Sequence, residues 1–178
     1  MIGVITATNR PNSISQIFSD TYYNKLISKN IDVLQFNLTS LPYDMFHPEM
    51  YSGHGMSDSL KEIQEKYIFP VQKFVIVVPE YNGTFPGVFK LFIDSISVRE
   101  NKRNFFGKKI ILVGVSDGRA GNLRGLDQIA NFMNYLGANI MPNRLPFSKI
   151  NNLINNNQIV DLETLHTIDN HINEIINY

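Results

Sequence analysis

The sequence contains no cysteine. This absence excludes disulfide bonds, thiolate metal ligands and cysteine nucleophiles. Any redox chemistry would therefore need a bound cofactor, because no thiol pair is available to exchange electrons.

The chain also lacks an excess of charge of either sign, since 16 basic residues balance 16 acidic ones. Such a balance produces no global field that would attract nucleic acid or an anionic membrane surface. No apolar run is long enough to span a bilayer, and the first ten residues, MIGVITATNR, carry no basic leader. We predict a cytoplasmic protein with no nucleic-acid partner and no membrane partner.

Several nucleotide and catalytic motifs are missing as well. The sequence has no G-x-G-x-x-G, no G-x-x-x-x-G-K-[ST] and no G-x-S-x-G, so a dinucleotide fingerprint, a triphosphate loop and a serine-hydrolase elbow are unsupported. The histidines lack the spacing of a metal pair, because His166 and His171 are five residues apart and His47 and His54 share a loop. We predict that all four are solvated and that there is no metal site.

The patterning that is present predicts one α/β domain over residues 1–178. The length and the 43% hydrophobic content suit a single sizeable core. Apolar segments predict five strands, at Ile2–Thr6, Val33–Phe36, Phe74–Val78, Ile110–Val115 and Asn139–Met141. Apolar residues at helical spacing predict helices between them, including Ile14–Leu26, Leu126–Leu136 and a last helix from Ile159 to Ile176. This alternation indicates a doubly wound parallel sheet with helices on both faces.

Three polar or irregular segments leave alternatives open. Leu41–Ser57 is predicted to be a surface loop that forms a lid, a subunit contact or a plain connector. Asn151–Asn157 is predicted to be a solvated linker before the last helix. A basic cluster either attracts a dinucleotide or forms an ordinary soluble face, and it comprises Arg99, Lys102, Arg103, Lys108 and Lys109.

The stretch Phe74–Gly87 predicts a strand that delivers a binding loop. Pro79 ends the ladder because it has no N–H to donate, and Asn82-Gly83 is a turn dipeptide that tolerates positive φ. Pro86 fits the first turn of a following helix, where its missing donor has no consequence. The backbone of residues 79–84 should therefore face a crevice.

The loop after the first strand predicts an anion site. It brings hydroxyl groups and Arg10 to a helix N-terminus, where free amides and the helix dipole favour a phosphate. The alternative is that Ser13 only caps the helix and Arg10 is solvated. The local pattern favours neither phosphate binding nor helix capping.

A family resemblance adds to this reading. The string Pro79–Thr84, followed by Pro86-Gly87-Val88, Lys90 and Asp94, closely resembles the flavin-contacting segment of the NAD(P)H-dependent FMN reductases. The resemblance implies a flavodoxin-like sheet of five strands in the order 2-1-3-4-5, with non-covalent FMN at the switch point between the first and third strands. It also implies NADPH or NADH as co-substrate.

The resemblance extends to the three loops at that edge. It places the FMN phosphate among Thr8, Arg10, Ser13, Ser15 and the backbone of Ile14. Many relatives have glycine where this chain has Ala7, whose methyl group would alter the loop slightly. The resemblance places the flavin ring against a second loop and a third, with the residues Pro79, Glu80, Tyr81, Asn82, Gly83, Ser116, Gly118 and Gly121.

The function that the resemblance implies is an NAD(P)H-dependent oxidoreductase. Bound FMN would pass hydride or electrons to a flavin, a quinone, an azo compound or a similar small acceptor, so no side chain is assigned as catalytic. There are two alternatives, a flavodoxin-type electron carrier and a structural relative without a cofactor. The zero net charge disfavours the carrier, because flavodoxin-type carriers are usually acidic. The family commonly forms homodimers or homotetramers, and we expect the same here.

Overall fold

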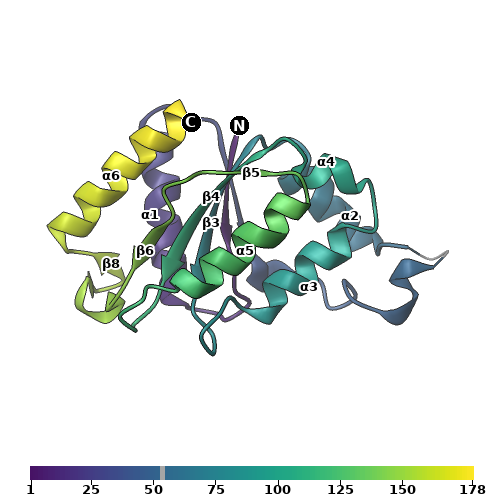
Figure 1. Ribbon diagram of the computed structural model, residues 1–178, viewed down its shortest axis with the longest axis horizontal. Helices are drawn as coiled ribbons and strands as arrows, with labels where there is room; N and C mark the ends of the chain where they lie inside the picture. The colour runs from purple at the N-terminus through teal and green to yellow at the C-terminus, as the bar shows by residue number, and fades with distance from the viewer. Residues whose placement is uncertain (53–54) are drawn as a thin grey trace.

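A computed structural model describes residues 1–52 and 55–178. Its centre is a parallel sheet in the order β2-β1-β3-β4-β5, with helices on both faces (Figure 1). The predicted fold class and strand order are confirmed. The strands of this sheet are β1 (Ile2–Thr6), β2 (Val33–Asn37), β3 (Lys73–Pro79), β4 (Lys109–Val115), β5 (Asn139–Ile140) and β6 (Leu145–Phe147).

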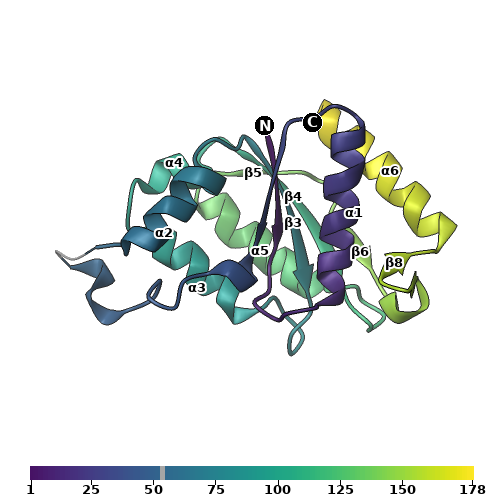
Figure 2. The same ribbon diagram turned by 180° about the vertical axis from the view of Figure 1, so that it is seen from behind.

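The helices fall into two layers (Figures 1 and 2). One face of the sheet is covered by α1 (Ile14–Ser28) and α6 (Leu162–Asn177). The other is covered by α2 (Asp58–Ile63) with its π-helical continuation η3 (Gln64–Ile68), α3 (Gly87–Ile96), α4 (Asn101–Phe105) and α5 (Leu123–Tyr135). Short 3₁₀ turns are η1 (Leu38–Ser40), η2 (Pro48–Tyr51) and η4 (Ile150–Asn152).

Each face of the sheet has its own hydrophobic core. Along β3, Phe74, Ile76 and Val78 pack into the α3/α5 core, whereas Val75 and Val77 pack into the α1/α6 core. This period-2 alternation with apolar residues on both sides is typical of a parallel strand that is buried twice. The sequence prediction of a central strand covered on both faces is therefore confirmed.

The fifth strand position is divided, which corrects the prediction of five strands. Over the described residues the sheet has six strands, because both β5 and β6 pair with β4. Lys109 and Ile110 pair with β5, and Val113–Val115 pair with β6. The intervening segment contains Pro142, which cannot donate to a ladder. The last predicted strand therefore ends early and pairing resumes three residues after Pro142.

The segment before the last helix is also more ordered than predicted. Asn151–Asn157, predicted as a linker, contains the end of η4 and most of a hairpin between β7 (Ile154–Asn155) and β8 (Gln158–Ile159). Its turn residues Asn156 and Asn157 have φ of 47° and 58°, which suits asparagine. Ile159 lies in β8, so the prediction that it begins the last helix was wrong. The helix α6 begins at Leu162 instead, and the carboxylate of its N-cap, Asp161, accepts a hydrogen bond from the Thr164 amide at 2.8 Å.

One of the histidines is not solvated. His171 on α6 is 1% exposed, and its Nδ1 lies 2.7 Å from the hydroxyl of Tyr22 on α1. The prediction of four solvated histidines was therefore wrong for His171, because the apolar face of α6 extends over it. His54 lies outside the described residues.

The burial of His171 predicts a loss of stability in acid. Burial lowers its pKa from the ordinary value of 6.5, although Glu174 and the Asn143 backbone oppose this shift. Below pH 6.5 His171 therefore binds a proton more readily in the unfolded chain than in the folded chain. The free energy of unfolding should fall as the pH falls. Urea unfolding of His171→Gln between pH 7.5 and pH 5 should show a shallower fall than the wild type. Equal slopes would contradict this role of His171.

The lysines at the amino edge of the sheet stabilise helix ends. Lys108 is buried and donates to Ile68 O at 2.7 Å, and burial lowers its pKa to about 8. Lys73 donates to Ile175 O at 3.0 Å and to Ile176 O at 2.9 Å. For Lys108 the interpretation as a solvated face was therefore wrong, since its ammonium group binds the carbonyls at the end of η3.

Candidate functional site

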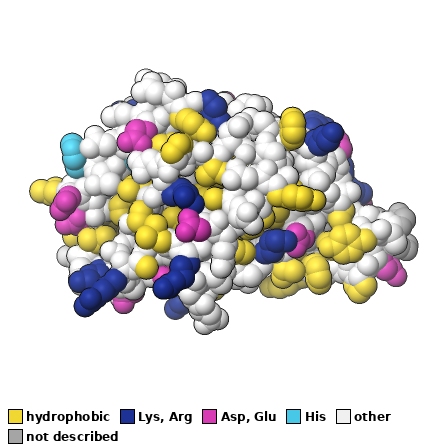
Figure 3. Space-filling model, viewed as in Figure 1, with side chains coloured by type: hydrophobic (Ala, Val, Ile, Leu, Met, Phe, Trp, Pro, Cys, Tyr) yellow, Lys and Arg dark blue, Asp and Glu magenta, His cyan; other side chains and the backbone are white. Residues whose placement is uncertain are grey.

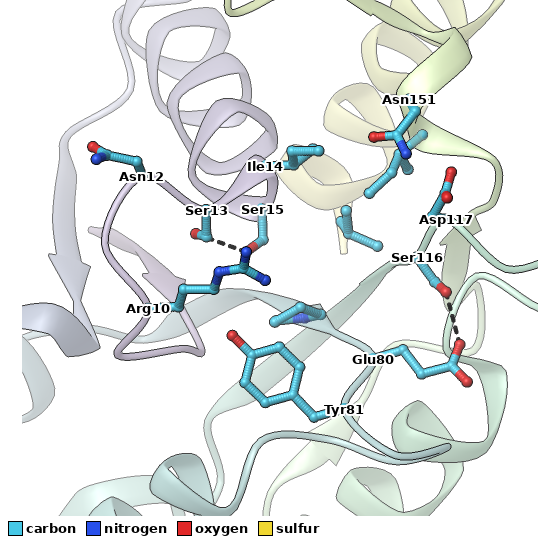
Figure 4. A pocket seen from close by; sticks show the side chains of 13 residues that line it. Arg10, Asn12, Ser13, Ile14, Ser15, Glu80, Tyr81, Ser116, Asp117 and Asn151 are labelled. Atoms are coloured by element: carbon cyan, nitrogen blue, oxygen red, sulfur yellow. Dashed lines mark hydrogen bonds between the residues drawn. The ribbon is translucent and has the colours of Figure 1, made fainter.

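A cavity of about 260 Å³ opens at the carboxyl edge of the sheet, where β1, β3 and β4 end (Figure 4). In open parallel sheets this edge holds the ligand at the point where strand order reverses. The loops after the three strands supply most of its walls. It is lined by Arg10, Asn12, Ser13, Ile14, Ser15, Pro79, Glu80, Tyr81, Val115, Ser116, Asp117, Ile150 and Asn151.

The first loop, between β1 and α1, brings a cation to a helix N-terminus. Figure 4 shows the Arg10 side chain extending into the cavity below Ser13 and Ser15. The Ser13 hydroxyl accepts a hydrogen bond from the Ser15 hydroxyl at 3.1 Å and makes no bond to the amides of α1. Among the described residues, the interpretation of Ser13 as a side-chain cap is therefore wrong. The first amides of α1 remain available to an anion.

Alanine in place of the glycine of many relatives fits this loop. Ala7 is fully buried, and its amide donates to Val77 O at 2.9 Å. The methyl group therefore packs beneath the loop while the backbone continues the register between β1 and β3.

The second loop is a tight turn after β3. Tyr81 and Thr84 exchange two backbone hydrogen bonds, at 2.8 Å and 3.1 Å. The central residues Asn82 and Gly83 have φ of 52° and 78°, as a type I′ turn requires. The turn prediction is confirmed, while Pro86 proves to be the N-cap of α3 and not a residue of its first turn.

The third loop is bonded to the second. Ser116 donates to a carboxylate oxygen of Glu80 at 2.8 Å, and the Gly118 amide donates to the Ser116 hydroxyl at 3.0 Å. Asn122 is 1% exposed and donates to Pro79 O at 2.9 Å. These bonds hold the ends of β3 and β4 in a fixed relation at the cavity rim.

A fourth wall comes from Ile150 and Asn151, which sequence reasoning missed. Backbone bonds from Lys149 N to Gly118 O at 3.3 Å and from Ile150 N to Ser116 O at 3.5 Å attach this segment to the third loop. The asparagine-rich composition of the segment favoured a linker, and only the pairing of β6 with β4 brings it to the site. Asn12 and Asp117 were also missed as lining residues, although both belong to the predicted loops.

Two glycines of the third-loop region serve close packing. A Cβ on Gly114 of β4 would overlap with the carbonyl oxygen of Gly121. A Cβ on Gly121, whose φ is +54°, would lie 2.7 Å from Cβ of Pro146. Gly114 therefore lets the third loop cross directly over β4, and Gly121 lets the same loop lie against β6.

The predicted site residues are placed in two groups. Those that line the cavity are Arg10, Ser13, Ile14, Ser15, Pro79, Glu80, Tyr81 and Ser116. The rest belong to the same three loops but are outside the cavity lining in the described part of the chain, and they are Thr8, Asn82, Gly83, Gly118 and Gly121.

The donor set suits a phosphate monoester at one side of the cavity. A guanidinium, two hydroxyls and helix amides converge there, and such donors bind phosphate oxygens without a lysine-centred loop. Glu80 and Asp117 lie on the opposite side (Figure 4), which is therefore unsuited to a second anion.

The described part of the chain contains neither a metal-binding cluster nor a membrane-spanning helix. Within residues 1–52 and 55–178, no group of three or more metal-binding side chains comes together. No helix in the same ranges has both the length and the hydropathy to cross a bilayer.

The fold and the cavity define a flavodoxin-like α/β protein with a cavity at the switch point of its sheet. The family described as NADPH-dependent FMN reductase matches residues 1–152, and the chain belongs to that family. The protein is accordingly an NAD(P)H-dependent flavin oxidoreductase.

Solved structures support the fold. FerB, a flavoenzyme NAD(P)H:(acceptor) oxidoreductase from Paracoccus denitrificans, superposes with a TM-score of 0.80 at 16% identity, over 99% of this chain and 95% of FerB. An oxidoreductase from Corynebacterium diphtheriae gives 0.73 at 17% identity, over 99% and 97% of the two chains. An azoreductase from Bacillus anthracis gives 0.66 at 15% identity, over 99% of both chains. At such identities the likeness shows the fold alone, and the comparison with curated proteins gave no match.

Proposed function

We propose that this chain, as one domain over residues 1–178, binds FMN non-covalently in the cavity at the carboxyl edge of the sheet. The phosphate would lie at the first loop and the flavin ring between the second and third loops. The observation that carries the proposal is that one cavity is lined both by Arg10 with the N-terminus of α1 and by the loops that follow β3 and β4.

Each wall of the cavity has a role in this proposal. Arg10, Ser13 and Ser15 would donate to phosphate oxygens together with the amides that open α1. The backbone of Pro79–Gly83 and of Ser116–Gly118 would meet the polar edge of the ring. Glu80 would hold the second loop to the third through its hydrogen bond from Ser116, which is 2.8 Å long.

When bound, FMN would supply the redox chemistry that connects NADPH or NADH to a small acceptor such as a flavin, a quinone or an azo compound. The cofactor supplies this chemistry, and the chain's residues orient it and leave one side open to reactants. No acid, base or nucleophile of the chain is required. The reaction partners are small molecules, and we place the protein in the cytoplasm.

Steady-state oxidation of NADPH and NADH tests this function against that of a flavodoxin-type carrier. Purified chain supplied with FMN should oxidise a free nicotinamide when an acceptor quinone or flavin is present. A carrier would show no turnover until a partner reductase is added, and that result would overturn the proposal. Free FMN at the same concentration without protein is the control for direct chemical reduction.

We infer a homodimer or homotetramer in solution. The segment 41–51 exposes aromatic residues beside α3, and hydrophobic side chains gather at that end of the molecule in Figure 3. Tyr43 is 108%, Phe46 52% and Tyr51 71% exposed, and exposed aromatic groups in one region favour a contact surface. Light scattering at micromolar concentration should give a mass of two or four chains, and a monomer would contradict the inference.

A further inference from the structure

Tyr81 lies on the second loop, but its hydroxyl is bonded to the first. The Tyr81 hydroxyl oxygen is 2.7 Å from Oγ1 of Thr8, a residue 73 positions earlier in the chain. Figure 4 shows the hydroxyl end of Tyr81 directed toward the first loop, beneath Arg10. We propose that Tyr81 is a positioning residue that fixes the phosphate loop through Thr8, beyond any contact its ring makes with a flavin.

The hydrogen-bond inventory of Thr8 supports this role. A threonine hydroxyl has one proton and two acceptor sites, and the Arg10 amide already donates to Thr8 Oγ1 at 3.1 Å. Its own proton and one further acceptor site then remain, and the 2.7 Å contact with the Tyr81 hydroxyl uses one of the two, since either oxygen can be the donor. In both directions Tyr81 is the second partner of the Thr8 hydroxyl.

Because Thr8 is buried, the loss of one of its hydrogen-bond partners should affect the first loop. Thr8 is 0% exposed, so water cannot replace a partner that is lost. Its bond to the Arg10 amide closes a short turn over residues 8–10, which sets where the Arg10 side chain leaves the backbone. The chain of bonds from Tyr81 through Thr8 to Arg10 therefore connects the loop assigned to the ring with the cation assigned to the phosphate.

This inference rests on the proposed function. A Tyr81 that positions the first loop and a Tyr81 that only contacts the flavin ring predict different results for one variant. Tyr81→Phe keeps the aromatic ring and removes only the hydroxyl. If Tyr81 acts through the first loop, the variant loses affinity for FMN but keeps its affinity for riboflavin, which has no phosphate. If Tyr81 acts only on the ring, the two ligands respond alike.

The test is a fluorescence titration of wild type, Tyr81→Phe, Thr8→Val and the double variant with FMN and with riboflavin. We expect Tyr81→Phe to weaken FMN binding about tenfold, the scale of one hydrogen bond near a charged group, with riboflavin unchanged. The double variant should be no weaker than Thr8→Val alone, because both changes break one chain of bonds. Tyr135→Phe, at a side chain that is 90% exposed and remote from the cavity, is the matched control.

Equal losses for FMN and riboflavin, no loss for either, or additive effects in the double variant would overturn the role of Tyr81. Hydrogen exchange of the flavin-free protein supplies an independent readout. The Arg10 amide should exchange faster in Tyr81→Phe than in wild type, and unchanged protection would also overturn the inference. A wild type that binds neither flavin would instead refute the proposed function, and the exchange measurement separates the two failures.

Discussion

Replacing Arg10 with alanine should weaken FMN binding by about 1.5–3 kcal/mol, which is the range for a hydrogen bond to a charged group. Arg10 is exposed and extends into the cavity below Ser13 and Ser15. Its removal should therefore change ligand affinity much more than protein stability. Isothermal titration of the flavin-free wild type and variant with FMN measures the difference.

The salt dependence of FMN affinity and the variant Arg10→Lys test whether the effect comes from the positive charge of Arg10. Affinity of the wild type for FMN should fall as salt rises, and the fall should be smaller for Arg10→Ala because one cation no longer faces the phosphate. Arg10→Lys should recover part of the affinity, since an ammonium group restores the charge but not the two-pronged geometry. Arg144, which is bonded to Asp127 outside the cavity, provides the control variant Arg144→Ala. An Arg10→Ala protein with unchanged affinity would refute the assigned phosphate role.

Replacing Gly114 with alanine should have the largest effect on stability, a loss of about 2–4 kcal/mol in the free energy of unfolding. The added Cβ would overlap with the Gly121 carbonyl oxygen and would lie 3.2 Å from a methyl group of Leu126. A carbonyl of the backbone cannot rotate away as a side chain can, so the third loop must lift from β4. FMN affinity should fall with it, because that loop forms one wall of the cavity.

Gly87→Ala is the matched control for this change. Gly87 is exposed at the first position of α3, and a Cβ there would meet nothing within 4 Å. The substitution should alter stability by less than about 1 kcal/mol. Urea unfolding of the three proteins checks the difference, and a Gly114→Ala protein as stable as Gly87→Ala would show that the third loop does not depend on this close approach.

The central strands were predictable because their physical signal is local. Phe74–Val78 and Ile110–Val115 are short apolar runs, and a strand buried on both faces needs little else. The order of the strands came from the family resemblance, since hydrophobic periodicity carries no information about which strands are neighbours. Arg10, Ser13 and Ser15 were candidates on local grounds, because hydroxyls and a cation before a helix suit an anion. The local pattern left helix capping as an equal alternative, and the family resemblance assigned these residues to the phosphate.

The features that escaped prediction depend on contacts between distant segments. Ile150 and Asn151 reach the cavity only because Phe147 and its neighbours pair with β4. His171 is buried because α6 packs against α1, and one helix alone does not reveal how wide its covered face is. Tyr81 was assigned to the flavin ring because of the loop to which it belongs. Its hydrogen bond with Thr8 joins residues 73 positions apart, and the sequence around neither residue indicates it.

The central claim is that the loops after β1, β3 and β4 hold one FMN per chain. A difference-absorbance titration of the purified, flavin-free protein with FMN, followed by NADPH under anaerobic conditions, tests it directly. We predict a saturable change in the flavin bands that ends at one FMN per chain, and bleaching of those bands when NADPH is added. A titration without saturation, or with flavin bands identical to those of free FMN, would contradict the claim.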